Sequence, residues 1–88
     1  MSSIDRPLSG DVLRFALATE RVRAGGAIAP HRASGPITVQ VLDGEIQFQA
    51  AGQEHRLGSG DLLLVNGGVE HAVSSQAGGT FLLTLAQA

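Results

Sequence analysis

The side chains that could do chemistry in this 88-residue sequence are three histidines, eight carboxylates and several hydroxyl groups. Cysteine and lysine are absent. There is therefore no disulfide, no thiolate nucleophile or thiolate metal site, and no lysine for Schiff-base chemistry. Any catalysis or ligand binding must depend on histidine, carboxylate or hydroxyl groups.

The three histidines differ in their sequence surroundings. Val69, His71 and Val73 alternate, so His71 shares the face of a strand that carries two valines. A buried imidazole requires a hydrogen bond, a metal or a ligand, and a hydrogen-bonded core histidine is the simplest of these interpretations. His31 ends an apolar segment, whereas His55 lies among charged residues beside a turn and is expected at the surface.

The charge balance argues against a nucleic-acid partner. The six cationic residues are all arginine, and with eight acidic residues they give a net charge of −2. This charge disfavours binding to a phosphate backbone, and three phenylalanines are the only aromatic residues that could stack on bases.

Length and composition predict one domain, residues 1–88, in which residues 1–10 form a flexible segment or an edge strand. Hydrophobic residues make up 43% of the chain and charged residues 16%, which is typical of a folded domain. No apolar run is long enough to span a bilayer, and the first residues lack the pattern of a signal peptide. We therefore expect a cytoplasmic protein with no membrane partner.

Turn signals recur every eight to ten residues and predict an all-β fold. The Asp43-Gly44 pair is the strongest local signal, because a two-residue turn needs the positive φ that glycine accepts freely, and it predicts a hairpin. The expected strands are Val12–Leu17, Thr19–Arg23, Ala27–His31, Ile37–Leu42, Glu45–Ala50, Gln53–Leu57, Asp61–Val65, Val69–Ser74 and Thr80–Leu85.

Two strands lack the alternation of a half-buried strand. Leu62–Val65 and Phe81–Leu83 are continuously apolar, which indicates that both faces are covered. A second subunit could supply the additional cover, so we expect a homodimer.

Two spaced motifs resemble those of the cupin superfamily. The first cupin motif, Gly-x5-His-x-His-x(3–4)-Glu-x6-Gly, is matched by the order Gly25, His31, Ala33, Ile37 and Gly44. The second, Gly-x5-Pro-x-Gly-x2-His-x3-Asn, is matched by the order Gly60, Asn66, Gly68, His71 and Ser75. Each motif keeps three of five positions and every spacing. The resemblance implies a small cupin-like jelly-roll β-barrel of two antiparallel sheets.

The same resemblance carries expectations about metal. In metal-binding cupins, two histidines and a glutamate of the first motif and one histidine of the second hold a divalent metal. Here Ala33 and Ile37 replace the second histidine and the glutamate, which leaves His31 and His71 as the metal-ligand candidates. No carboxylate in the strand pattern replaces Ile37. We expect at most a low occupancy of a divalent transition metal such as Zn, Fe, Mn or Ni.

The remaining site is an apolar barrel pocket with two imidazoles. The residues expected to bind a ligand are His31, His71, Ala33, Ile37, Phe48 and Val73, with Val39, Phe81 or Leu83 also in the lining. The leading hypothesis is a small-molecule-binding protein, and the alternative is a metal-dependent oxygenase or isomerase; the ligand and any reaction stay open. A third hypothesis is an interaction module that uses an exposed sheet face around Thr38, Gln40, Gln47 and Gln49.

Overall fold

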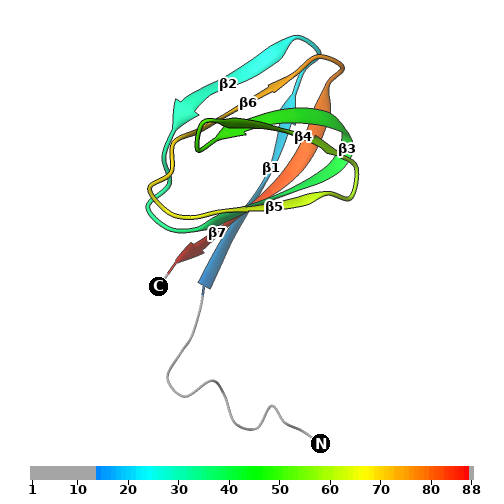
Figure 1. Ribbon diagram of the computed structural model, residues 1–88. Helices are drawn as coiled ribbons and strands as arrows, with labels where there is room; N and C mark the ends of the chain where they lie inside the picture. The colour runs from blue at the N-terminus through cyan, green and yellow to red at the C-terminus, as the bar shows by residue number, and fades with distance from the viewer. Residues whose placement is uncertain (1–13, 88) are drawn as a thin grey trace, which may run out of the picture.

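The computed structural model describes residues 14–87, which form seven β-strands (Figure 1). The expected flexible segment or edge strand at residues 1–10 lies outside the described residues. No helix in the described part of the chain is long and apolar enough to cross a membrane. The strands are β1 (Arg14–Val22), β2 (Gly26–His31), β3 (Ile37–Ala50), β4 (Gln53–Gly58), β5 (Leu62–Val65), β6 (His71–Ser75) and β7 (Gly79–Gln87).

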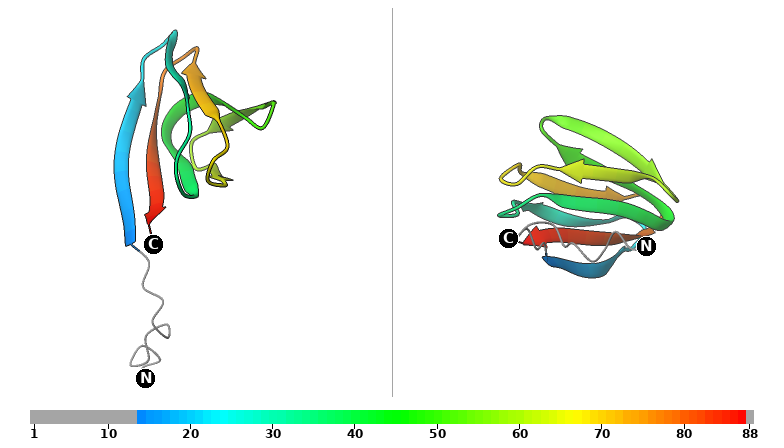
Figure 2. Two further views of the ribbon diagram at one scale, coloured as in Figure 1. Left: turned by 90° about the vertical axis from the view of Figure 1, so that its left-hand side faces the viewer. Right: turned by 90° about the horizontal axis from the view of Figure 1, so that it is seen from below.

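All strand pairs are antiparallel, and they form two layers that share the long strand β3. The first half of β3 pairs with β5 and β7, and β1 extends that layer beside β7. The second half of β3 pairs with β4 and β6, and β2 extends the second layer beside β6. The views in Figure 2 show how β3 curls from one layer to the other and closes the barrel on one side.

The expected hairpin at Asp43-Gly44 is wrong, because β3 runs through both residues without turning back. The register of β3 against β7 shifts between Val41 and Asp43, and Gly44 has a φ of 75°. The positive φ that the sequence predicted is therefore used in a β-bulge, which bends a strand instead of reversing it. The two strands expected before residue 24 likewise merge into one strand, β1.

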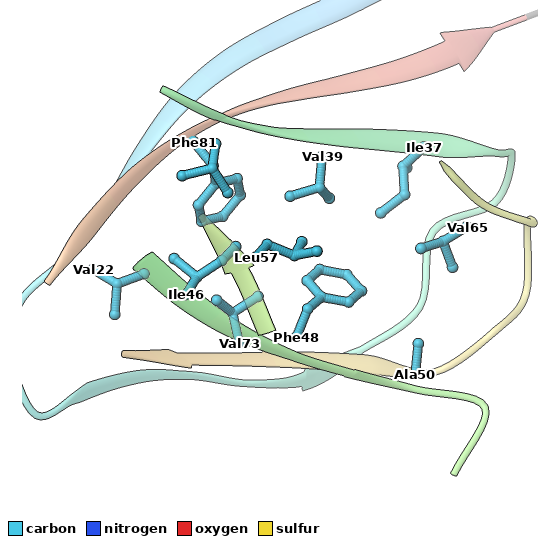
Figure 3. Close-up of a cluster of buried hydrophobic side chains, with 11 residues drawn as sticks. Val22, Ile37, Val39, Ile46, Phe48, Ala50, Leu57, Val65, Val73 and Phe81 are labelled. Carbon is cyan, nitrogen blue, oxygen red and sulfur yellow. The ribbon is translucent and has the colours of Figure 1, made fainter. Parts of the chain in front are cut away.

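Alternating apolar residues of β3 supply both sides of the core. Ile37 and Val39 point inward from the first layer, and Ile46 and Phe48 point inward from the second (Figure 3). Phe81 of β7 and Val73 of β6 face each other across the same space. Each half of β3 therefore turns alternate apolar residues toward the core, although the two halves belong to opposite layers.

The side chain of Ser75 forms hydrogen bonds at the junction between the layers. Its hydroxyl donates to the carbonyl oxygen of Glu45 at 2.5 Å and accepts from the amide of Gly78 at 2.8 Å. Ser75 is buried, and it replaces the asparagine of the second cupin motif. One small hydroxyl thus links the bulge region of β3 to the turn between β6 and β7.

The outer face of the first layer carries exposed leucines. Leu62 and Leu64 of β5 and Leu17 of β1 are 61 to 65% exposed in the single chain. Leu63 and Val65 point inward. The continuously apolar segment Leu62–Val65 therefore has apolar residues on both faces of β5. Within residues 14–87, no segment covers this outward face, for which the sequence predicted a cover.

Candidate functional site

The structure brings His31 and His71 together although they are 40 positions apart. His31 ends β2, His71 begins β6, and the two residues are partners in the antiparallel register. Their Nε2 atoms are 3.1 Å apart, and the ring centroids are separated by 4.3 Å. The two imidazoles therefore act as one polar group at the edge of the barrel interior, where His71 is buried and His31 is exposed.

Backbone hydrogen bonds fix the orientation of both rings. The Nδ1 atom of His31 lies 3.0 Å from the carbonyl oxygen of Ala29, and that of His71 lies 3.0 Å from the carbonyl oxygen of Val69. A carbonyl oxygen only accepts hydrogen bonds, so both Nδ1 atoms carry hydrogen in this arrangement. The contact between the two Nε2 atoms is then a hydrogen bond only when one of them also carries a proton.

His71 is held further by Phe48. The two rings are stacked with centroids 5.5 Å apart and planes 15° from parallel, and both residues are buried. Since Phe48 is fixed in the core of the second layer, its ring supports one face of the His71 imidazole.

The loops that carry the two histidines are joined by Arg32. Its guanidinium donates to the carbonyl oxygen of Gly68 at 2.7 Å, and the amide of Gly68 donates to the carbonyl oxygen of Ala33 at 2.9 Å. In the structure Arg32 is exposed yet positions the segment that leads to His71 against the end of β2.

A cavity of about 130 Å³ lies next to the histidine pair, between the two layers. Of the residues expected to bind a ligand, His31, His71, Ile37, Phe48 and Val73 line it, as do Phe81 and Leu83. Ala33 and Val39 are not among its lining residues: Ala33 packs beside the core, and Val39 is completely buried within it.

Sequence reasoning missed two lining residues, Glu20 and Ile28. Glu20 lies opposite Phe81 in the register of β1 and β7, so its side chain is on the inner face of the first layer. The signal was present in the sequence, because Glu20 and Val22 share one face of a strand and Val22 is buried. Glu20 therefore brings a strand carboxylate to the cavity that the sequence reasoning did not consider.

The remaining sequence candidates lie elsewhere. His55, expected at the surface, is half-buried opposite Phe48 and lines a separate hollow of about 230 Å³ beside β5. A larger and mostly open hollow of about 400 Å³ extends from the turn between β3 and β4, with Glu54, to Glu70 and His71, so His71 borders this hollow as well.

The proposed interaction face does not exist as one surface. Thr38 and Gln40 pair with strands of the first layer, whereas Gln47 and Gln49 belong to the second layer. Because β3 crosses between the layers, these polar residues lie on two different outer faces, and Gln47 is buried.

The side chains at the cavity can be compared with the ligands that a metal ion requires. Two imidazole nitrogens on one tetrahedral zinc lie about 3.3 Å apart, given zinc–nitrogen distances of about 2.05 Å, so the 3.1 Å spacing suits two ligands. Within residues 14–87, however, no three His, Asp or Glu side chains are grouped to hold a metal ion. The residues present do not fit a metal centre with three protein ligands, because Ala33 and Ile37 supply no donor atom.

A barrel of two antiparallel layers, in which histidines from β2 and β6 meet at a cavity between the layers, is the arrangement of the cupin class of proteins. The family model for the cupin domain matches residues 18–84, and the chain belongs to this family.

Solved structures show the same fold. The chain is similar to a conserved protein of unknown function from Streptococcus pyogenes, with a TM-score of 0.79 and 19% identity over 84% of this chain and 65% of that one. It is also similar to an RmlC-like cupin from Shewanella frigidimarina, with a TM-score of 0.78 and 22% identity over 84% and 67% of the two chains. A DMSP lyase from Ruegeria pomeroyi matches with a TM-score of 0.78 and 24% identity over 83% and 38%. The chain thus spans about two thirds of the length of the first two proteins. Among curated proteins there is no significant match.

Proposed function

We propose that this protein binds a small molecule in the cavity between its two layers, with His31 and His71 as the polar anchors. The observation that carries the proposal is the convergence of two oriented imidazoles at one cavity with mostly apolar walls. Apolar walls with a few convergent polar groups are the usual composition of a small-molecule site. The cavity is small, so the ligand, or the part of it that enters, is small as well.

Thermal unfolding in the presence of a broad panel of small metabolites tests the proposal. A ligand at about 100 times its Kd adds about 2.7 kcal/mol to the free energy of unfolding. For a domain of this size, that corresponds to a rise in Tm of at least about 10 °C. We expect at least one compound to raise the Tm, and a panel without any such compound would contradict the proposal.

Single alanine variants at the three histidines locate the binding site. We expect His31→Ala and His71→Ala each to weaken binding at least tenfold, because each removes one of the two Nε2 groups. His55→Ala is the matched control, since His55 lies in a separate hollow and should leave the affinity unchanged. Equal losses in all three variants would argue against the histidine pair as the anchor.

A metal-dependent enzyme is the second candidate, favoured by the spacing of the two Nε2 atoms. The structural neighbours include a salicylate dioxygenase and a predicted oxalate decarboxylase, which is fold-level support only. We expect elemental analysis of protein purified without chelator to give well below one Zn, Fe, Mn or Ni per chain. Stoichiometric metal that is lost in His31→Ala and His71→Ala, but kept in His55→Ala, would favour the enzyme.

We also propose that two chains associate through the outer face of the first layer. Two cross-strand rows on this face, Leu17-Thr84-Thr38-Leu64 and Thr19-Leu82-Gln40-Leu62, contain no charged residue. Large exposed apolar patches of this kind mark association surfaces. Light scattering after size exclusion should give twice the chain mass, and Leu64→Asp should reduce it to one chain. Ala27→Asp, on the outer face of the second layer, should leave the mass unchanged.

A further inference from the structure

Glu20 is the one acidic residue that lines the cavity of the histidine pair. It is half-buried and lies on the inner face of β1, directly opposite the buried Phe81. Within residues 14–87, its carboxylate takes part in no side-chain hydrogen bond and no ion pair, with either histidine or with an arginine. The described fold therefore gives this inward-facing carboxylate no structural partner.

The side chains around Glu20 in the cavity offer its carboxylate no hydrogen bond. Its neighbours in the cavity include Phe81, Ile28 and Leu83, whose side chains are apolar. The carboxylate thus has no side-chain partner in the described fold, and a ligand in the cavity could supply one.

The cavity thus has polar groups at two separate places. The histidine pair presents two Nε2 atoms at one of them, and a ring that carries a second proton donates from its Nε2. Glu20 offers acceptor oxygens at the other, and within residues 14–87 no ion pair joins it to either imidazole. The volume of about 130 Å³ corresponds to about four water molecules, so a ligand that touches both places is a short one.

We propose that Glu20 determines ligand specificity by accepting a hydrogen bond from the far end of a short-chain carboxylate. The carboxylate of the ligand would accept a hydrogen bond from the Nε2 of His31 or His71 in the form of the pair that carries a second proton on that ring, and a terminal hydroxyl or ammonium group would donate to Glu20. The carbon chain between them would contact the apolar wall. This inference rests on the proposed small-molecule function and names its ligand class.

Matched sets of probes test the inference by calorimetric titration of the full chain. The probes are propionate and butyrate, their terminal hydroxy derivatives, and their terminal amino derivatives β-alanine and γ-aminobutyrate. We expect the best donor-bearing probe to bind at least tenfold more tightly than the plain acid of the same length, because hydrogen bonds to a charged group are strong. The comparison of hydroxyl with ammonium identifies the donor.

Glu20→Gln should reduce the preference for the ammonium probe over the plain acid of the same length at least tenfold. Glu20→Leu should abolish the preference for either donor. Glu70→Gln is the matched control, since Glu70 is exposed and does not line this cavity.

Equal affinities for plain and donor-bearing probes, in the wild type and in Glu20→Gln, would overturn the inference and leave the proposed function intact. Absence of binding by every probe would also overturn it. The proposed function would then be judged separately, from the wider ligand panel and the histidine variants.

Discussion

Gly44→Ala is expected to lower the free energy of unfolding by about 3 kcal/mol or more. Two effects add at this position. Gly44 has a φ of 75°, which costs alanine roughly 1 to 2 kcal/mol. A Cβ atom at Gly44 would also collide with the carbonyl oxygen of Gly78 and lie 2.9 Å from the Cα of Gly79. Both obstacles are backbone atoms, so the bulge or the start of β7 must shift.

Gly52→Ala separates the clash from the conformational cost. Gly52 has nearly the same φ, 76°, but a Cβ there would have no neighbour within 4 Å. We expect a loss of only about 1 kcal/mol in chemical denaturation. If the two variants lose the same free energy, the close approach of β3 to the segment before β7 does not constrain Gly44.

Phe48→Ala is expected to lower the free energy of unfolding by about 3 to 5 kcal/mol and to weaken ligand binding. Phe48 is 1% exposed, packs between the two layers, and supports the ring of His71. Its removal leaves a void in the core and frees the imidazole to change its orientation. Denaturation in urea and titration of a panel ligand measure the two effects.

Two control variants separate the effect of Phe48→Ala on stability from its effect on ligand binding. Phe48→Leu keeps most of the volume and should cost about 1 kcal/mol. Ile46→Ala removes an equally buried side chain that does not line the cavity, so it should destabilise the fold by about 2 to 5 kcal/mol while leaving the affinity of the folded protein unchanged. A comparable loss of affinity in Ile46→Ala would show that Phe48 acts through general stability alone.

Compared with the metal-binding cupin motifs, this chain keeps two of the histidines and lacks the other two metal ligands. Both rings keep a backbone acceptor on Nδ1, which is the arrangement that orients an imidazole toward a ligand on Nε2. Ala33 and Ile37 remove donor atoms, whereas Glu20 introduces an acceptor from a different strand. The site therefore differs in composition from the metal-binding motif, while both of its histidines are oriented by backbone hydrogen bonds.

The sequence by itself determined the fold class, because turn signals and two spaced motifs are local features. It also identified His31 and His71, since strand alternation assigns His71 to the inner face and motif spacing marks both. Ile37, Phe48 and Val73 followed from the same alternation, and all three line the cavity.

Only the tertiary structure decided how distant segments meet. The local sequence Asp43-Gly44 is typical of a turn. Pairing of β3 with β7 on one side of this point and with β4 on the other keeps β3 continuous, so a bulge forms in place of the turn. Glu20 enters the site for a similar reason: its strand alternation gives a face, but only pairing with β7 places that face over the histidine cavity. Alternation along a strand fixes on which side a residue lies, whereas long-range pairing fixes what lies on that side.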